Sequence, residues 1–341
     1  MKPINVGLVG ATGLVGEVFV QLMEEREFPV GELRPFASEN SAGLKLRCQN
    51  REFAVQTLKP GCFEGLDLVF FSSGDDISLQ WAPHAVECGA YAVDNSAAFR
   101  RDPDKLLLVP EVNGHLLNSL TGPAVIANPN CSTIQLVVAL RPLAIQYGLE
   151  SVRVASYQAV SGAGKAAKEE LMAQVQAWLD HEELPAPKAF AQRIAFNCLP
   201  HIGSFAEDGF SSEEDKVIFE TKKILGLSDL PVSAFTVRVP VWNGHSEAVW
   251  VTLKKEATLA EMQNTLRTGP GLVLMDDLQN KVYPTVNDAD GQNPVYVGRV
   301  HRDRDFPKSW LMWVVADNIR KGAALNGLQI AEHIFDIPSR P

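Results

Sequence analysis

The chain has 341 residues, of which 46% are hydrophobic and 21% are charged, the composition of a globular protein long enough for two domains with their own cores. Its formal net charge is −10 and no run of Lys or Arg appears, which argues against nucleic acid or an anionic membrane surface as a partner. The longest apolar runs are far below the roughly 18 residues needed to cross a bilayer, so we expect no membrane association.

The cysteines and histidines exclude two further classes of protein. Five cysteines are widely scattered without a CxxC pair, which favours free thiols in a reducing cytoplasm over a disulfide framework. Seven histidines are dispersed with no ligand spacing, so no metal site is predicted. The first residues enter a strand directly, and we therefore expect no signal peptide.

A strand, a glycine-rich turn and a helix follow one another near the N-terminus. Residues 4–9 form a short apolar run, and residues 17–23 have helical spacing. Between them, Gly10, Gly13 and Gly16 would let the backbone approach a pyrophosphate that rests on the N-terminus of the helix. The spacing is GxxGxxG rather than GxGxxG, so this prediction of a dinucleotide-binding loop depends on the flanking strand and helix.

The second predicted strand, residues 33–37, ends where such a fold meets the adenosine ribose of its cofactor. Glu39 in the following turn has the chemistry to accept hydrogen bonds from a free ribose hydroxyl, whereas the 2′-phosphate of NADP requires a cation. Lys45 and Arg47 are near in the sequence, but the sequence does not fix their direction. These residues alone leave NAD and NADP both open.

Further strands at residues 66–71 and 90–93, separated by a helix at 78–88, continue the alternation of strands and helices. This alternation predicts a parallel, doubly wound sheet whose polar turns face a ligand. Arg100 and Arg101 follow the last of these strands. Such a pair is typical of a solvated surface, although one guanidinium at the ligand-facing edge would bind an anion.

An apolar strand at residues 124–127 is followed, after a short break, by an apolar helix. Cys131 is therefore predicted on the turn into this helix, with Asn130 or Ser132 as its N-cap. The positive end of the helix favours the thiolate, which is the form that attacks a carbonyl carbon. A buried and inert cysteine is the alternative.

The second half of the chain has strands that follow one another with few helices between them. Residues 183–212 are rich in Pro, Gly and Ser and are expected to be mostly loop, and residues 242–246 are predicted to form a hairpin or a crossover. This pattern predicts a mixed, largely antiparallel sheet. The expected strands lie at 152–160, 232–241, 247–253, 295–300 and 310–315, and the expected helices at 165–181, 212–226 and 323–335.

The fold class that follows is α/β with two domains. Residues 1–130 are expected to form a Rossmann-type, doubly wound parallel sheet, and residues 131–318 a second α+β domain with the mixed sheet. The C-terminal helix, within residues 319–341, is expected to return to the first domain. Cys131 would then lie at the join, where we expect a cleft.

Taken singly, the polar residues of the second half have ordinary explanations. His245 is typical of a polar turn, and Glu220 with Lys223 is typical of an exposed i,i+3 pair on a helix. Arg238 inside an apolar strand is harder to dismiss, because burying an unpaired guanidinium is costly. Their interpretation depends on the segments around them.

Several segments carry a recognisable pattern. They are Gly10–Gly16, Asn128–Thr133, Tyr157–Gly164, Glu220–Lys223, Arg238–Glu247, and Ala316–Asn318 with Lys321–Ala324. In this order and with this spacing, the chain resembles the aspartate-β-semialdehyde dehydrogenase family over nearly its full length.

The resemblance implies a role for each matching residue. The nucleophile is Cys131, the acid/base group is His245, and Gln158 orients the substrate at the acyl centre. Arg238 binds the α-carboxylate of the substrate and Glu220 binds its α-ammonium group. The phosphate is bound by Arg100, Lys223 and Asn130. The nicotinamide cofactor is bound by Gly10, Thr12, Gly13, Leu14, Val15, Gly16, Asn40, Ser41, Ser161, Gly162 and Asn318.

The implied reaction is the NADPH-dependent, reversible reduction of β-aspartyl phosphate to aspartate semialdehyde and phosphate, in lysine, threonine and methionine biosynthesis. A thiolate attacks the acyl phosphate to give a thioester, and a hydride then reaches the thioester carbonyl. A neutral imidazole takes the thiol proton and later returns a proton. The phosphate needs cations, and the amino-acid end needs one cation and one anion, which matches the residues present.

One position departs from the family's pattern. Asn40 stands where the family usually has an Arg that meets the 2′-phosphate of NADP. Beside Glu39 it leaves NAD use, or dual use, open. The expected cofactor is therefore NADP, with NAD as a second candidate.

Three other interpretations are open at this point. An N-acetyl-glutamyl-phosphate reductase uses the same thioester chemistry but has no free α-ammonium for Glu220. A glyceraldehyde-3-phosphate-type dehydrogenase has no use for Glu220 together with Arg238. A catalytically inactive paralogue that serves as a scaffold predicts loss of the catalytic residues, which are all present. The resemblance also implies a homodimer formed through the second domain.

Overall fold

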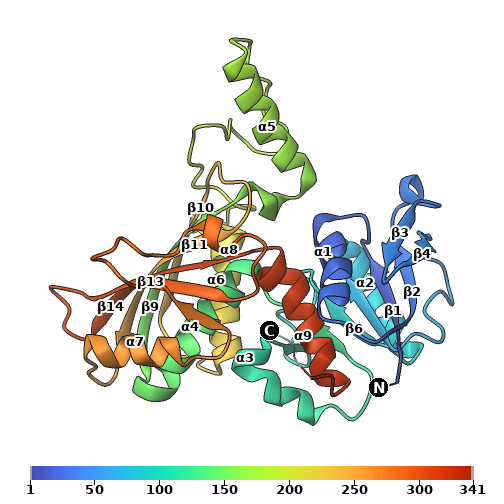
Figure 1. Cartoon of the computed structure of the whole chain (residues 1–341). Coiled ribbons are helices and arrows are strands. Elements are labelled where there is room, and N and C mark those ends of the chain that lie inside the picture. Colours follow the sequence, from blue (N-terminus) through green and yellow to red (C-terminus); the bar gives the residue numbers. More distant parts are fainter. Residues whose placement is uncertain (1, 339–341) are drawn as a thin grey trace. The chain divides into compact units, whose positions relative to one another are not determined.

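The computed structural model describes residues 2–338, which form two compact units. One unit comprises Met1–Asn130 with Ala323–Pro341, and the other comprises Cys131–Gly322. Residues 1 and 339–341 lie outside the described part. The first residue of the predicted span 1–130 and the last three residues of the predicted span 319–341 are therefore not described. Figure 1 shows the two units with the chain coloured from N- to C-terminus.

The first unit is built on a six-stranded sheet with the strand order β2-β1-β5-β6-β8-β7, in which every neighbouring pair is parallel. The order reverses at β1 and β5, the position where doubly wound sheets bind their ligands. The predicted Rossmann-type fold is confirmed. The elements of this unit are β1 (Ile4–Val9), α1 (Leu14–Glu25), β2 (Val30–Phe36), η1 (Glu39–Ser41), β3 (Lys45–Cys48), β4 (Arg51–Ala54), β5 (Leu68–Phe71), α2 (Asp75–Glu87), β6 (Tyr91–Asp94), β7 (Leu106–Leu107), α3 (Pro110–Asn113), η2 (Gly114–Ser119), β8 (Val125–Ala127) and α9 (Leu325–Ile334).

Helix α9 completes the core of the first unit from the far end of the chain. Its residues Leu325, Leu328 and Ile330 belong to the same buried cluster as the strands β1 and β5. Arg26 at the end of α1 donates two hydrogen bonds to the carboxylate of Glu332 at 2.7 and 2.8 Å, and both side chains are buried. A buried, bidentate pair of this kind ties α9 to α1 in one orientation.

Local differences from the expected elements concern the start of α1 and a small hairpin. Helix α1 begins at Leu14, three residues before the predicted start, so its N-terminus lies directly after the glycine loop. The antiparallel hairpin β3–β4 was not expected from the sequence. Its turn residues Gln49 and Asn50 both have positive φ, as a two-residue hairpin turn requires.

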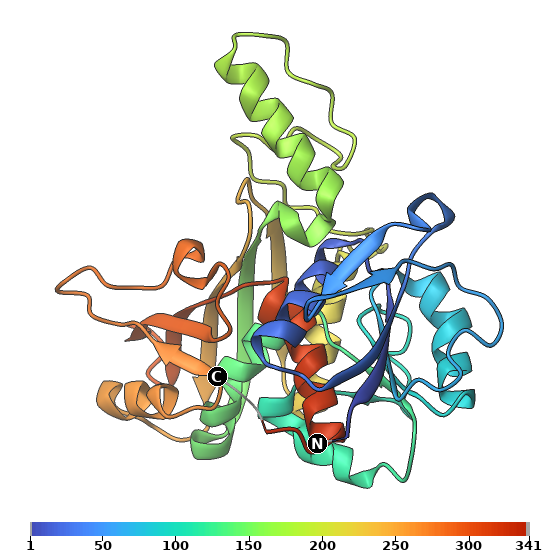
Figure 2. The same cartoon turned by 45° about the vertical axis from the view of Figure 1, so that its right-hand side comes forward.

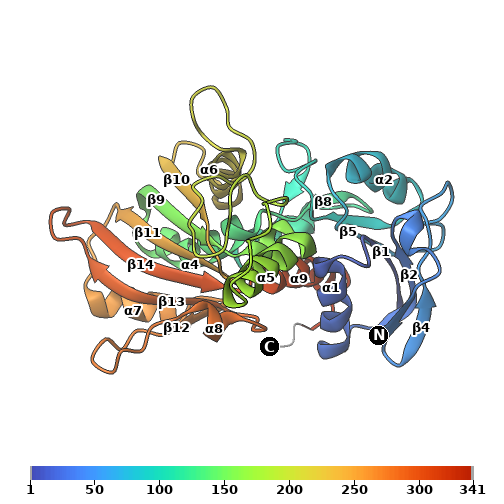
Figure 3. The same cartoon turned by 90° about the horizontal axis from the view of Figure 1, so that it is seen from above.

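The second unit is built on a mixed sheet with the strand order β10-β9-β11-β14-β13-β12 (Figure 3). The outer pairs β10/β9 and β12/β13 are parallel, and the three inner pairs are antiparallel. The predicted mixed, largely antiparallel sheet is confirmed. The elements are α4 (Cys131–Tyr147), β9 (Leu149–Gln158), η3 (Val160–Ala163), α5 (Lys165–Leu179), α6 (Ser212–Leu225), β10 (Val232–Arg238), β11 (His245–Leu253), α7 (Leu259–Arg267), β12 (Leu272–Leu274), α8 (Val286–Ala289), β13 (Val295–Arg302) and β14 (Ser309–Ala316), and the π-helical turn η4 (Arg320–Ala324) crosses the boundary between the units.

The segment 242–246 is a crossover and not a hairpin. Strand β9 lies between β10 and β11 and pairs with both, so the chain must pass over it to reach β11. Strand β11 also begins at His245, which the sequence placed in a turn. Helix α7 and strand β12, between β11 and β13, were not predicted.

The two faces of this sheet differ in their covering. Helices α4, α6 and α7 pack against one face, and on β9 and β11 alternate residues are buried there, as a pleated strand requires. The other face carries exposed aromatic side chains, including Tyr157, Phe235 and Trp250. Helix α5 and the long loop after it extend away from the sheet as an arm, drawn in light green in Figure 2. Among the described residues, no helix combines the length and the apolar composition that a membrane crossing needs.

Candidate active site

Cys131 is the first residue of helix α4, so its thiol lies in the first turn, where the unpaired N–H groups of a helix favour negative charge. The side chain is partly exposed. Gly322 lies against it: a Cβ added at Gly322 would stand 2.8 Å from the Cβ of Cys131. The lack of a side chain at 322 is therefore what leaves room for this cysteine.

The end of strand β9 gathers the other predicted catalytic residues. The backbone N–H of Ala159 donates to Nδ1 of His245 at 3.1 Å, and the Ala159 carbonyl accepts from Nη1 of Arg238 at 2.7 Å. Gln158 precedes Ala159 and lies opposite Arg238 in the register of β9 and β10. One peptide segment thus fixes the positions of an imidazole and a guanidinium.

His245 is a neutral hydrogen-bond donor in this arrangement. The ring is fully buried, and burial, followed by the nearby charge of Arg238, lowers its pKa to about 3. Because Nδ1 accepts the Ala159 N–H, the proton of the neutral ring is on Nε2. Among the described residues Nε2 has no hydrogen-bond partner, so its N–H is available to another group.

Arg238 is buried next to groups of opposite charge. Burial lowers the pKa of its guanidinium, and the charges of Glu213 and Cys131 act in the other direction. A Cβ added at Gly162 would lie 2.9 Å from Nη1 of Arg238 and 3.2 Å from the ring of His245. The structure therefore brings Gly162, Arg238, His245 and Cys131 into one neighbourhood.

Gln158 makes a contact that sequence reasoning missed. Its amide nitrogen donates to the hydroxyl of Ser156 at 3.2 Å and to Oε1 of Glu213 at 3.3 Å. The acidic first turn of α6, which contains Glu213, was expected from the sequence only as a helix-start signal. No pattern in the sequence distinguishes Glu213 from Glu214 and Asp215, the acidic residues that follow it.

Glu220 and Lys223 both lie on α6, but their exposure differs. Glu220 is buried, whereas Lys223 is half-buried, so this is not an ordinary surface pair. Arg100 and Asn130 belong to the first unit and are both buried there. The guanidinium of Arg100 donates to the carbonyl oxygen of Asn95 at 2.9 Å, which holds it at the end of β6.

Glu247 is a second buried acid that the sequence did not single out as functional. It is fully buried two residues after His245 on the same face of β11, and neither oxygen has a hydrogen-bond partner of ordinary geometry within residues 2–338. Burial raises the pKa of this carboxyl well above its usual range, with the amide of Gln135 beside it. Burial thus favours the neutral form of this carboxyl.

The glycine loop of the first unit has the geometry of a phosphate cradle. Gly10 has a φ of 87°, and a Cβ there would meet the Ser72 carbonyl oxygen at 2.3 Å. A Cβ at Gly16 would meet the carbonyl oxygen of Gly10 at 2.4 Å, so α1 packs on the loop only because Gly16 lacks a side chain. Gly13 is the N-cap of α1 and no side chain caps the helix there. Its first-turn N–H groups suit an anion.

The loop after β2, residues 37–44, contains no Lys or Arg beside the predicted ribose-binding residues. Glu39 and Asn40 are exposed, and Ser41 is half-buried. Lys45 pairs with Glu52 at 2.6 Å, and Arg47 donates to Asn50 at 3.0 Å, both within the β3–β4 hairpin. Lys45 and Arg47, the basic residues that follow this loop, are therefore directed to their own hairpin.

In the second unit, Asn318 offers a buried donor. Its Oδ1 accepts hydrogen bonds from the Ser161 hydroxyl and the Gly244 N–H, both at 2.9 Å. Its Nδ2 is buried and has no partner among the described residues. An oriented amide donor with no protein acceptor suits a carboxamide oxygen such as that of nicotinamide. Residues 2–338 contain no cluster of His, Cys, Asp or Glu suited to a metal ion.

Two family models match the chain. The model described as semialdehyde dehydrogenase, NAD binding domain, matches residues 5–120, and the model described as semialdehyde dehydrogenase, dimerisation domain, matches residues 140–321. Together they cover most of both units.

Individual proteins are similar over nearly the whole chain. The aspartate-semialdehyde dehydrogenase of Aquifex aeolicus is 47% identical, covering 96% of this chain and 97% of its own, and that of Bacillus subtilis is 44% identical, covering 98% of each. The crystal structure of Vibrio cholerae aspartate semialdehyde dehydrogenase II complexed with ASA superposes with a TM-score of 0.95 at 41% identity, covering 98% and 99%. The Candida albicans enzyme with NADP gives 0.77 at 26% identity, covering 99% and 100%.

Proposed function

The chain belongs to the aspartate-semialdehyde dehydrogenase family, and from this premise we propose that it catalyses the reversible, NADPH-dependent reduction of β-aspartyl phosphate to aspartate semialdehyde and phosphate. The reaction serves lysine, threonine, methionine and diaminopimelate biosynthesis in the cytoplasm, a compartment that suits its free cysteines. The observation that carries the proposal is the Ala159 peptide, which holds His245 and Arg238 beside the helix that begins with Cys131.

The first step is acyl transfer to Cys131. The N-terminus of α4 and the charge of Arg238 both favour the thiolate, which adds to the acyl carbon while the phosphate leaves. In this proposal Arg238 binds the α-carboxylate and Glu220 the α-ammonium. Phosphate binding is assigned to Lys223, Arg100 and Asn130.

His245 acts through its Nε2–H. Taking a proton at Nε2 would require the ring to carry its own proton on Nδ1, which the Ala159 N–H opposes. We therefore assign it a donor role, in place of the proton-accepting step expected from the sequence. A donor at Nε2 stabilises negative charge on sulfur or on the substrate oxygen as the tetrahedral species forms and collapses.

The nicotinamide cofactor supplies the hydride that converts the thioester to the aldehyde. In the first unit, Gly10, Thr12, Gly13, Leu14, Val15 and Gly16 would hold the pyrophosphate, with Asn40 and Ser41 at the ribose. In the second unit, Ser161 and Gly162 would hold the nicotinamide end, and the Nδ2 group of Asn318 would donate to its carboxamide.

The decisive assay is phosphate-dependent reduction of NADP or NAD by aspartate semialdehyde. Cys131→Ala is expected to abolish it, because no other group supplies the thiolate. N-acetyl-glutamate semialdehyde, which has no free ammonium, is expected to be a poor substrate. If N-acetyl-glutamate semialdehyde were the better substrate, the chain would be an N-acetyl-glutamyl-phosphate reductase.

For the cofactor, we propose that the site accepts NAD as well as NADP, because no fixed cation lies in the loop containing Asn40. Fluorescence titration with each oxidised nucleotide is expected to give affinities within about tenfold of each other. Asn40→Arg should tighten NADP by about 10- to 100-fold and leave NAD nearly unchanged, since a charge-assisted bond to phosphate is gained. A parent preference for NADP above about a hundredfold contradicts the proposal.

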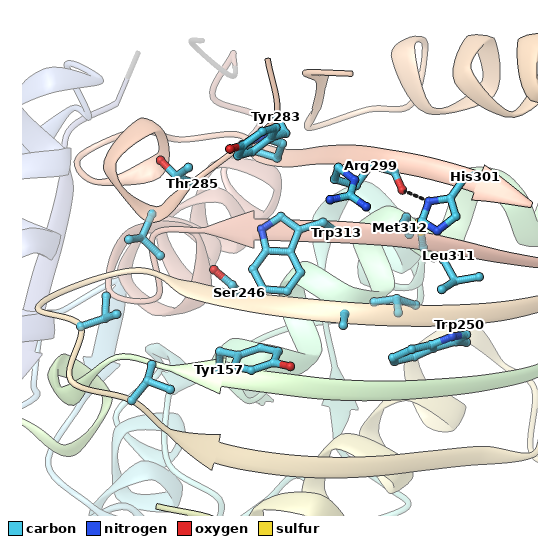
Figure 4. A pocket seen from close by; sticks show the side chains of 16 residues that line it. Tyr157, Ser246, Trp250, Tyr283, Thr285, Arg299, His301, Leu311, Met312 and Trp313 are labelled. Atoms are coloured by element: carbon cyan, nitrogen blue, oxygen red, sulfur yellow. Dashed lines mark hydrogen bonds between the residues drawn. The ribbon is translucent and has the colours of Figure 1, made fainter. Parts of the chain in front are cut away.

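We also propose a homodimer formed through the outward face of the second sheet, which lies within the segment that matches the dimerisation-domain model. A largely apolar groove of about 620 Å³ runs across β9, β11, β14 and β13 there, and Figure 4 shows Tyr157, Trp250, Tyr283 and Trp313 around it. Light scattering should give a dimer mass. Trp250→Asp should weaken the dimer, whereas Leu179→Asp on the arm should not, because Leu179 is exposed (57%, against 36% for Trp250) but lies outside the groove. A monomer at micromolar concentration contradicts the proposal.

A further inference from the structure

Two adjacent glutamates in the first turn of α6 are buried to the same extent, Glu213 at 6% and Glu214 at 7% exposure, but their contacts differ. Glu214 forms a capping box: it accepts from the Ser211 N–H at 2.8 Å, and its own N–H donates to the Ser211 hydroxyl at 3.3 Å. Its other oxygen accepts from the Thr236 N–H at 3.0 Å. Glu214 therefore fastens the helix to β10, a structural task.

Glu213 contacts Gln158 of the candidate active site instead. Its Oε1 accepts from the amide nitrogen of Gln158 at 3.3 Å, and its Oε2 lies 3.3 Å from Nζ of Lys216. Its charge also acts on the buried guanidinium of Arg238, which lies opposite Gln158 in the register of β9 and β10. A buried carboxylate destabilises the fold unless it is paired. Here the polar groups that interact with it include Gln158, a predicted catalytic residue, and Arg238, a predicted substrate-binding residue.

The contact fixes which way the Gln158 amide points. Its nitrogen has two hydrogens, and both have acceptors, the hydroxyl of Ser156 at 3.2 Å and the carboxylate of Glu213. A carboxylate only accepts, so the flipped amide would place two oxygens against each other. Gln158 consequently turns its carbonyl oxygen, an acceptor, away from Glu213.

We propose that Glu213 is a positioning residue, which orients the Gln158 amide and supplies the counter-charge that keeps Arg238 placed for the substrate carboxylate. This inference rests on the proposed function for the identity of the substrate. Its task is distinct from that of Glu214, although the two residues are neighbours on one helix turn.

Kinetics on two Glu213 variants separate its two effects. Glu213→Gln keeps an acceptor for Gln158 but removes the charge, so kcat/KM for aspartate semialdehyde should fall about tenfold, mainly through a higher KM. Glu213→Leu removes both, and kcat should fall as well, for a loss of about 100-fold in kcat/KM. Glu214→Gln is the matched control: its melting temperature should fall, and its kcat/KM should stay within about twofold.

A second readout needs no substrate. The rate of Cys131 alkylation by iodoacetamide, followed by peptide mass spectrometry across pH, reports the pKa of that thiol. In Glu213→Gln no negative charge offsets the positive charge of Arg238, so Arg238 stabilises the Cys131 thiolate more strongly. The alkylation profile of Glu213→Gln should therefore move to lower pH. The profile of Glu214→Gln should coincide with that of the parent.

These measurements decide between the possible outcomes. Equal KM, kcat and alkylation profiles for Glu213→Gln and the parent overturn the positioning role, as does an equal kinetic loss in Glu214→Gln. A parent enzyme without aspartate semialdehyde activity refutes the proposed function, while the alkylation profiles still test the link from Glu213 through Arg238 to Cys131.

Discussion

The close approach of Gly322 to Cys131 leads to a quantitative prediction for Gly322→Ala. The new Cβ would lie 2.8 Å from the Cβ of Cys131 and 3.3 Å from its Cα, closer than carbon atoms pack without strain. Neither atom is the end of a flexible side chain, so backbone must move, and the contact reaches about 3.5 Å or more only after a shift of several tenths of an ångström. Overpacking of this kind costs about 1–3 kcal/mol, and a nucleophile displaced by about 1 Å loses roughly 100-fold in rate.

We therefore expect Gly322→Ala to lower kcat by about 10- to 100-fold with a smaller change in KM, because the variant moves the nucleophile and leaves Arg238 in place. Steady-state kinetics and urea unfolding measure the two costs separately. Gly122→Ala is the control, since a Cβ at Gly122 meets nothing within 4 Å, and it should leave kcat unchanged. An unchanged kcat in Gly322→Ala would refute the reasoning, because it would mean that the position of Cys131 tolerates this shift.

Three further predictions concern buried ionisable groups. The folded His245 ring has a pKa of about 3, so between about pH 6.5 and pH 3 the imidazole binds a proton only in the unfolded chain. The free energy of unfolding should therefore fall by up to about 1.4 kcal/mol per pH unit as the pH is lowered through this range. His245→Asn should remove this slope in urea titrations. Burial raises the pKa of the Glu247 carboxyl, so unfolding above about pH 4.5 releases its proton and is favoured by rising pH. Glu247→Gln should therefore be more stable than the parent at pH 7. Equal stability of the two proteins at pH 7 would contradict this reasoning. Arg26→Met removes two charge-assisted hydrogen bonds from the buried carboxylate of Glu332 and should cost about 3–5 kcal/mol, most of it regained in the double variant with Glu332→Leu. A cost below about 1 kcal/mol would contradict this prediction.

Features that depend on contiguous residues were predictable from the sequence. The strand, glycine loop and helix at residues 4–25 follow from the local sequence pattern. Gly10 and Gly16 lie at positions where a side chain would clash with nearby backbone atoms. The parallel first sheet and the mixed second sheet follow from the spacing of strands and helices. The hairpin at β3–β4 carries its own turn signal in Asn50, a residue that tolerates positive φ, so a closer reading of the turn would have found it.

Features that depend on strand order were not predictable. Residues 242–246 resemble a hairpin turn, and only the insertion of β9 between β10 and β11 makes them a crossover. The same arrangement brings Ala159 against both His245 and Arg238, which are far from it in the chain. Glu213 is an ordinary helix-start residue by sequence, and its contact with Gln158 exists only because α6 packs on β10.

The division of the first unit between the two ends of the chain has a consequence during synthesis. Leu325, Leu328 and Ile330 fill the same core as β1 and β5, yet a ribosome makes them about two hundred residues after the last strand of that sheet. The sheet face that α9 covers stays open on the nascent chain while the whole second unit is translated and emerges. A message truncated before residue 323 would thus yield a chain whose damage lies at its N-terminal end, where chaperones would bind the uncovered sheet.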